Sequence, residues 1–309
     1  MKYGEQPIKL CQVLAAQQTF FATMNREIIK MRDMKFNPEL FRNYMSGTVL
    51  DELLCSYKGL PKGVNYMIIG DPGVGKTTII LDLLSNIRKC NTGVRVLFIS
   101  AEMNEIDLAI YVQRFPKFQD LDILFIEANF DEEDDSHNLE TLKSTLEQGW
   151  DIVAIDSFYE LQGIIKDEEN YTLKKAESVL LSIIKQQNKA ANSRGVNTTF
   201  LTIQQVTKTG HFIGSNRLKH AITAMLELRL ENPKNIYSDR YAVFSKHRRG
   251  DVGVRLYYDL SVTGDVYYNA EKFEQDRKLR KLQSTASGSL RKFADQFDKI
   301  FNNQNKTGA

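Results

Sequence analysis

Short apolar runs alternate with helical patterns through the middle of the chain. Runs rich in β-branched residues predict strands at residues 64–69, 94–100, 123–127, 152–155 and 198–203. Between them, apolar residues at helical spacing predict helices at residues 78–87, 105–115, 139–149 and 173–191. Strands that alternate with helices predict an α/β fold, with a mostly parallel central sheet covered by helices on both faces.

The pattern changes beyond residue 224. Apolar segments split by polar turns follow at residues 225–230, 241–246 and 254–260. They predict short antiparallel strands that extend the sheet near its C-terminal end. We therefore expect three parts: a helical arm at residues 1–45, a main α/β domain at residues 46–270 and a basic polar tail at residues 271–309. The arm is either an appendage that packs on the main domain or a docking arm for a neighbouring subunit. The tail is either a solvated helix pair or a contact for nucleic acid.

Composition limits the partners and the cellular compartment that we expect for the protein. The 309 residues are 42% hydrophobic and carry a net charge of +2, which is too mild to indicate a nucleic-acid partner by itself. The three cysteines (Cys11, Cys55 and Cys90) are scattered and form neither a zinc module nor a disulfide framework. No apolar run approaches the ~20 residues of a membrane helix. We expect a cytoplasmic protein without membrane contact.

Residues 70–77 read Gly-Asp-Pro-Gly-Val-Gly-Lys-Thr and match the phosphate-binding loop pattern G-x-x-x-x-G-K-[ST]. Glycines let backbone N–H groups approach phosphates, Lys76 reaches the β- and γ-phosphates, and the Thr77 hydroxyl binds Mg²⁺. A predicted strand precedes the loop and a predicted helix follows it, as this kind of site requires. The candidate nucleotide-binding residues are Gly70, Asp71, Pro72, Gly73, Val74, Gly75, Lys76, Thr77 and Thr78.

Two carboxylates follow predicted strands. Asp156 ends a hydrophobic strand, where an aspartate of a phosphate-loop ATPase holds the Mg²⁺ shell together with Thr77. Glu102 follows the strand after the phosphate-loop helix, where ligands lie on such sheets, and can activate the attacking water. The alternative for Glu102 is a surface glutamate that opens the next helix.

Beyond the predicted strand at residues 198–203, Gln205 is a polar amide that can sense the γ-phosphate. The loop after it contains Lys208, His211 and Arg217, with glycines at 210 and 214 that allow movement. A mobile basic loop after a sensor is typical of a DNA-contacting element. An ordinary surface loop is the alternative.

Three cationic side chains lie at the end of a predicted strand, in Lys-His-Arg-Arg-Gly at residues 246–250. Strand alternation sends Lys246 and Arg248 to the same side. There they can stabilise transition-state charge at the γ-phosphate of a neighbouring subunit, as an arginine finger does. A plain charged hairpin turn is the alternative.

The order of these motifs resembles the RecA-type core of bacterial RadA (Sms), the ATPase of recombinational repair. The resemblance covers residues 46–269 and includes Ser-Gly at 46–47, Leu-Asp-Glu-Leu at 50–53, the phosphate loop, Ile-Asp-Ser at 155–157, Gln-Val-Thr-Lys-Thr-Gly at 205–210, Leu-Lys-His at 218–220 and Lys-His-Arg-Arg-Gly at 246–250. The last stretch is similar to the K-N-R-F-G motif of that family, with Arg249 in place of phenylalanine. Ser-Ala-Glu-Met at 100–103 and the K-x-R-x-G spacing also resemble replicative helicases of the DnaB type.

The resemblance implies a RecA-like phosphate-loop ATPase with ATP and Mg²⁺ as cofactors. Both families form hexameric rings on single-stranded DNA and hydrolyse ATP between subunits, which implies a homo-oligomer, single-stranded DNA and recombination or replication proteins as partners. In this chain the zinc module and the Lon-protease-like domain usual for RadA are missing, so we expect a stripped core. Three functions stay open: a RadA-type DNA-dependent ATPase in branch migration or helicase-like translocation, a DnaB-type replicative helicase core, and a RecA-fold regulatory switch without translocation.

Overall fold

The computed structural model describes residues 30–34, 38–127, 137–204, 215–235, 237–283 and 285. The chain divides into two compact units, residues 1–37 and 38–309. In the first unit the described residues form a short 3₁₀ helix, η1 (Met31–Asp33). The helical arm expected at residues 1–45 therefore lies mostly outside the described residues.

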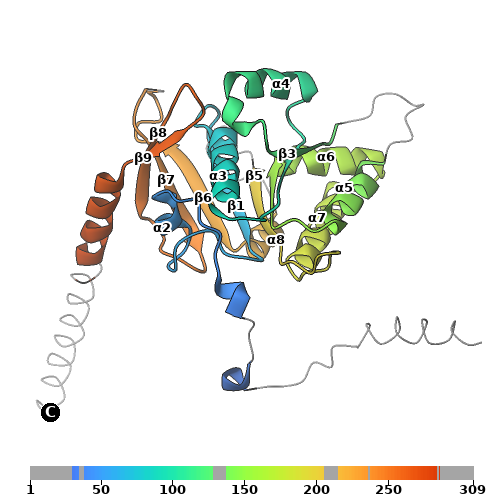
Figure 1. Ribbon diagram of the computed structural model, residues 1–309, viewed down its shortest axis with the longest axis horizontal. Helices are drawn as coiled ribbons and strands as arrows, with labels where there is room; N and C mark the ends of the chain where they lie inside the picture. Colours follow the sequence, from blue (N-terminus) through green and yellow to red (C-terminus); the bar gives the residue numbers. More distant parts are fainter. Residues whose placement is uncertain are drawn as a thin grey trace, which may run out of the picture. The chain divides into compact units, whose positions relative to one another are not determined.

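A nine-stranded sheet forms the centre of the described part of the second unit (Figure 1). Its strands lie in the order β3-β2-β4-β5-β1-β6-β7-β8-β9. Their bounds are β1 (Asn65–Gly70), β2 (Val96–Ser100), β3 (Asp122–Phe125), β4 (Ile152–Asp156), β5 (Thr199–Gln204), β6 (Ala224–Leu230), β7 (Arg240–His247), β8 (Arg255–Leu260) and β9 (Val266–Tyr268). Neighbouring strands from β3 to β6 are parallel, and β7, β8 and β9 are added antiparallel. The predicted α/β fold with antiparallel strands near the C-terminal end is confirmed.

Strand β6 joins the parallel and antiparallel parts of the sheet. It runs parallel to β1, with Ala224 opposite Tyr66 and Leu228 opposite Gly70, a pairing that the apolar pattern did not predict. It is antiparallel to β7 alone. The physical reason is the connection: residues 205–223, which include helix α8 (Asn216–Ala221), are long enough for the crossover that a parallel strand requires.

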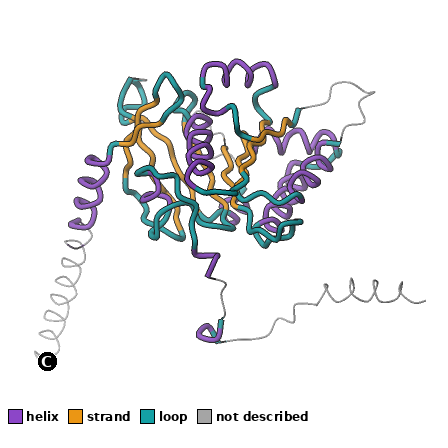
Figure 2. The backbone as a smooth tube through the Cα atoms, in the orientation of Figure 1, coloured by secondary structure: helices purple, strands orange, loops and turns teal. Residues whose placement is uncertain are grey.

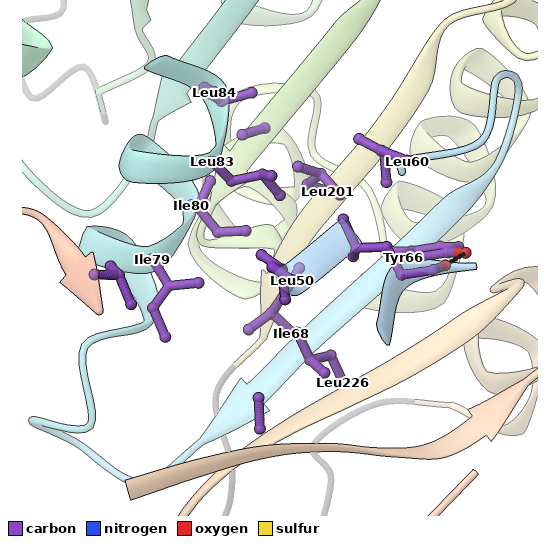
Figure 3. Close-up of a cluster of buried hydrophobic side chains, with 14 of the residues drawn as sticks. Leu50, Leu60, Tyr66, Ile68, Ile79, Ile80, Leu83, Leu84, Leu201 and Leu226 are labelled. Carbon is purple, nitrogen blue, oxygen red and sulfur yellow. Dashed lines mark hydrogen bonds between the residues drawn. The ribbon is translucent and has the colours of Figure 1, made fainter. Parts of the chain in front are cut away.

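Helices cover both faces of the sheet. On one face lie α2 (Leu50–Leu54) and α3 (Lys76–Cys90); on the other lie α5 (Asn138–Glu147), α6 (Phe158–Glu168), α7 (Leu173–Gln187) and α8. Strand β1 shows how alternation divides the core, because Tyr66 and Ile68 join the cluster that contains Ile80 of α3 (Figure 3), whereas Met67 and Ile69 join the opposite cluster. Figure 2 traces the alternation of helices and strands along the backbone.

The pattern of apolar positions missed α6, α8 and β9. For α6 a local signal exists, since the Ser157 side chain caps the helix by accepting from the N–H of Glu160. In α8 only Leu218 is buried among the side chains that the structure describes, which leaves no periodic stripe to detect. The remaining short elements are η2 (Pro38–Phe41), α4 (Glu105–Arg114) and η3 (Pro116–Phe118).

The tail begins as a helix. Residues 270–283 are helical, with Phe273 buried against the domain and Arg277 paired with Glu52 of α2 at 3.2 Å. Leu279 and Leu282 are exposed. Among the helices described, none combines the length and the apolar character needed to cross a membrane.

Candidate nucleotide and metal site

Three parallel strands end at the same edge of the sheet and carry the predicted chemistry there. Strand β1 ends at Gly70 and leads into the phosphate loop, β2 ends at Ser100 just before Glu102, and β4 ends at Asp156. The carboxyl ends of parallel strands are where ligands bind in such sheets. The loop, Glu102 and Asp156 line one cavity of about 680 Å³. The structure thus brings together the three motifs that the sequence pattern singled out.

Thr77 and Asp156 make the shortest polar contact in this cavity. The Thr77 hydroxyl donates a hydrogen bond to the Asp156 carboxylate across 2.5 Å, joining the start of α3 to the end of β4. Lys76 donates to the backbone carbonyls of Gly70 at 2.9 Å and Asp71 at 3.1 Å. A hydroxyl and a carboxylate side by side are oxygen ligands of the kind that Mg²⁺ prefers.

The charges of this site are coupled. Burial raises the pKa of Asp156 to about 6; the Thr77 hydrogen bond opposes the rise and the nearby Glu102 carboxylate adds to it. Burial also lowers the pKa of Lys76, while Asp156 and Glu102 oppose that shift. A divalent cation between Thr77 and Asp156 would favour the ionised carboxylate, because opposite charge stabilises it.

The loop fits a phosphate group. Gly75 has a left-handed backbone with φ +92°, and a Cβ built there would lie 2.5 Å from a methyl carbon of Leu260. Glycine therefore lets the loop curl under the adjoining turn, so that its N–H groups can face an anion. No cluster of three or more His, Cys, Asp or Glu side chains that could hold a metal occurs among the described residues. A site built on Thr77 and Asp156 agrees with this, since Mg²⁺ in such sites takes most of its ligands from phosphates and water.

Sequence reasoning missed the other side of the cavity. Its lining continues with Tyr111, Arg114 and Phe115 from the end of α4, and with Leu260, Ser261 and Val262 where β8 enters a turn. The Tyr111 and Thr78 hydroxyls are hydrogen bonded at 2.6 Å. These residues belong to no motif, and only the tertiary arrangement brings them to the same cavity as the phosphate loop.

Two of the predicted loop residues do not line the cavity with their neighbours. Asp71 contributes its backbone carbonyl to Lys76, and Val74 is buried, with its carbonyl accepting from the Tyr258 hydroxyl at 2.9 Å. The other predicted loop residues, Gly70, Pro72, Gly73, Gly75, Lys76, Thr77 and Thr78, all line it.

Lys246 and Arg248 lie at the other end of the strands, where β1 and β6 begin. His247 pairs with Ala224 at the start of β6, and Ala224 pairs with Tyr66 near the start of β1. Both cations reach the end of α8: Lys246 donates to the carbonyls of Lys219 and Ile222, the latter at 3.0 Å, and Arg248 donates to that of His220 at 3.1 Å. They share a side, as strand alternation predicts, and they lie away from the phosphate loop of their own chain.

The predicted DNA-contacting loop is described only at its end. Arg217 lies in α8 and donates to the Ser178 hydroxyl of α7 at 3.0 Å. Gln205, Lys208 and His211 lie outside the described residues.

Comparisons with known proteins agree with this geometry. The family model described as "ATPase: KaiC" matches residues 46–258. The chain is 25% identical over 191 residues to the DNA repair protein RadA of Mycolicibacterium smegmatis, covering 62% of this chain and 38% of that protein. It is 25% identical over 207 residues to RadA of Aquifex aeolicus, covering 67% and 42%. The chain thus spans about two-fifths of the length of these relatives.

Among solved structures, the KaiC-like protein PH0186 from Pyrococcus horikoshii OT3 superposes with a TM-score of 0.56 at 20% identity, covering 74% of this chain and 99% of that one. At this identity the likeness concerns the fold. It agrees with a RecA-like sheet that carries the phosphate loop after β1.

Proposed function

Because this chain belongs to the KaiC family of RecA-like ATPases through residues 46–258, we propose that it is a Mg²⁺-dependent ATPase of RadA type that acts on single-stranded DNA. Membership of an ATPase family implies ATP binding, usually with Mg²⁺. The finer parts of the proposal are the DNA substrate, a ring of identical subunits, and branch migration or helicase-like translocation in recombination, repair or replication.

The observation that carries the proposal is the convergence of Lys76, Thr77, Glu102 and Asp156 on one cavity. Lys76 binds the β- and γ-phosphates, and Thr77 and Asp156 hold the metal shell. Glu102 orients and activates the attacking water. Mg²⁺, when bound, neutralises the charge that develops on the phosphates.

The location of Lys246 and Arg248 supports hydrolysis between subunits. They lie at the end of the strands away from the phosphate loop of their own chain, so the γ-phosphate that they can reach belongs to a neighbouring copy. There they stabilise transition-state charge in trans. A site divided in this way requires assembly before it can turn over.

The DNA-binding part of the proposal is supported by the similarity to proteins named DNA repair protein RadA. We assign Gln205 as the γ-phosphate sensor and Lys208, His211 and Arg217 as DNA contacts. Since the chain spans about two-fifths of those relatives, this assignment concerns the core alone.

The direct test measures ATP hydrolysis with and without single-stranded DNA. The wild-type protein is expected to show DNA-stimulated hydrolysis, and DNA binding that weakens steeply with salt because phosphate contacts release counterions. Lys76→Ala is expected to lower the rate by about 100-fold or more, because it removes a group that stabilises transition-state charge. Lys143→Ala, an exposed lysine of α5, is the matched control and should keep the wild-type rate. Hydrolysis by Lys76→Ala at the wild-type rate would contradict the assignment.

A second candidate is a RecA-fold ATP-binding switch whose output is assembly or partner binding. The observation that favours it is the family match. The family model that covers residues 46–258 is described as KaiC, whereas the similarity to the RadA proteins is limited to 25% identity. In the same assay a switch binds ATP but shows neither stimulation by DNA nor a steep salt dependence. A DnaB-type helicase core is the third function. Its ATP hydrolysis would also be stimulated by single-stranded DNA, so an assay for unwinding of a forked duplex distinguishes it from the other two.

A further inference from the structure

An ion-pair bridge, buried at one carboxylate and exposed at the other, ties the turn between β8 and β9 to the phosphate-loop helix. Lys117 of η3 donates to Asp82 of α3 and, at 2.6 Å, to Asp265 at the end of the turn. The side chain of Asp82 is 3% exposed and that of Lys117 is 13% exposed, while Asp265 is 41% exposed. The Lys117 ammonium group therefore joins a buried carboxylate inside the domain to a partly exposed carboxylate at the turn.

The same hairpin touches the phosphate loop directly. The Tyr258 hydroxyl donates to the Val74 carbonyl at 2.9 Å, and Leu260 fills the space that a Cβ at Gly75 would need. On its other side, the turn approaches η3 so closely that a Cβ at Gly264 would lie 3.0 Å from the rings of Phe115 and Phe118. The hairpin is thus packed between the loop and η3.

Residues 260–262 form a wall of the nucleotide cavity that adjoins the phosphate loop at Gly75, and we call them the turn wall. The turn is internally closed: the Asp265 N–H donates to the Ser261 hydroxyl at 2.8 Å, and the Thr263 hydroxyl donates to Asp265 at 2.7 Å. Because Asp265 is bonded to Ser261 at the start of the turn and to Thr263 within it, displacing Asp265 displaces the wall as well.

The cavity lining beyond the phosphate loop and the two carboxylates differs in character from the loop. It consists of Tyr111, Arg114, Phe115, Leu260, Ser261 and Val262. Aromatic and aliphatic groups with a single cation fit a planar base better than they fit a phosphate. With phosphates on the loop, the nucleoside would lie between α4 and the turn wall.

We propose that Lys117 is a positioning residue for the nucleoside half of ATP, because its bridge from Asp82 to Asp265 holds the turn wall at a fixed distance from the phosphate loop. This inference rests on the proposed ATP site. Hydrogen bonding to Lys117 lowers the pKa of Asp265, whereas burial raises the pKa of Asp82 and Lys117 opposes that rise.

The test compares two ligands, Mg²⁺–ATP and Mg²⁺–tripolyphosphate, that share the phosphate chain but differ in the nucleoside. Asp265→Ala cuts the exposed end of the bridge and leaves the buried Lys117–Asp82 pair intact. It is expected to weaken ATP binding about tenfold, the effect of losing one modest contact, while tripolyphosphate binding stays within about twofold of wild type. Asp239→Ala, which removes another exposed ion pair, the one with Lys272, outside the residues that line the cavity, should bind both ligands like wild type.

Lys117→Met is the second variant, with its melting curve recorded because it leaves Asp82 buried without its partner. It is expected to show the same selective loss of ATP. Equal weakening of both ligands in Asp265→Ala would overturn the inference, since the phosphate loop itself would then be disturbed, and so would unchanged affinity for both. If wild-type protein binds neither ligand, the proposed ATP site fails instead, so the two failures are distinguishable.

Discussion

Gly73 and Gly75 both have a left-handed backbone in the phosphate loop, but their surroundings differ. Their φ angles are +79° and +92°. A Cβ at Gly73 would meet no heavy atom within 4 Å, whereas one at Gly75 would lie 2.5 Å from Leu260. The sequence motif treats the two glycines alike, but the hairpin that contains Leu260 makes Gly75 the more constrained of the two.

This difference can be measured by unfolding in denaturant. Gly73→Ala is expected to cost about 1–2 kcal/mol of unfolding free energy, the strain of a left-handed residue with a Cβ. Gly75→Ala bears that strain and also overpacks against Leu260, which adds about 1–3 kcal/mol. Each variant is the control for the other, and equal losses would show that Leu260 moves aside at no cost.

At the scale of elements, His247 connects β7 to the end of α2. Its Nε2 lies 3.0 Å from the Leu54 carbonyl, and its Nδ1 accepts from the N–H of Arg249 at 3.1 Å. The ring packs edge-to-face on Tyr66 at 5.4 Å and against Phe244 at 4.2 Å. Burial lowers the pKa of His247, and the Leu54 carbonyl and Asp251 only partly oppose that shift.

A lowered histidine pKa makes stability depend on pH with a definite sign. The unfolded chain binds the proton more readily, so the free energy of unfolding is fully retained above the ordinary value of 6.5 and declines as pH falls from there towards the folded pKa. His247→Gln should remove this decline, although the lost packing lowers stability at pH 8 by about 1–3 kcal/mol. Denaturant unfolding between pH 5 and pH 8, about the range in which histidine titrates, measures both effects.

His137→Gln is the matched control, because its side chain is 63% exposed. That variant should keep the pH dependence of the wild type. A wild-type profile that is flat across this range, or one unchanged in His247→Gln, would contradict the assignment to His247.

At the scale of the whole molecule, the two ends of the sheet carry different halves of the proposed chemistry. The carboxyl ends of β1, β2 and β4 bring the phosphate loop, Glu102 and Asp156 together, while Lys246 and Arg248 cap the end of α8 at the other end of the strands. Because the halves are separated by the length of the strands, we expect the proposed site to need two copies to be complete.

Mixing experiments test this division. Lys76→Ala and Arg248→Ala proteins should each be inactive in ATP hydrolysis, but an equal mixture should regain activity at about a quarter of its interfaces, where the intact half of each variant meets. The rate is measured across mixing ratios with total protein held constant. No restoration at any ratio would argue against an action in trans.

Local pattern predicted the main elements and the phosphate end of the site. Strands such as residues 152–155 and 198–203 were found within a residue or two, because their apolar runs are buried on both faces. The place of Thr77, Glu102 and Asp156 at one end of the sheet was predictable because each lies at or after the carboxyl end of a strand, where ligands bind in such sheets. The parallel pairing of β6 with β1 was not predicted, since apolar alternation does not say which neighbour a strand will pair with.

The sequence by itself determined the chemistry that is local: a glycine-rich loop between strand and helix, and acidic groups at strand ends. Only the tertiary structure decided what surrounds that loop, including the turn wall, the Lys117 bridge that holds it and the remote place of Lys246 and Arg248. The physical reason is the distance along the sequence between the residues that come into contact. Periodicity records which face of one element is buried, whereas Lys117 meets Asp82 and Asp265 across 35 and 148 residues of chain, a contact that exists only after the sheet has formed.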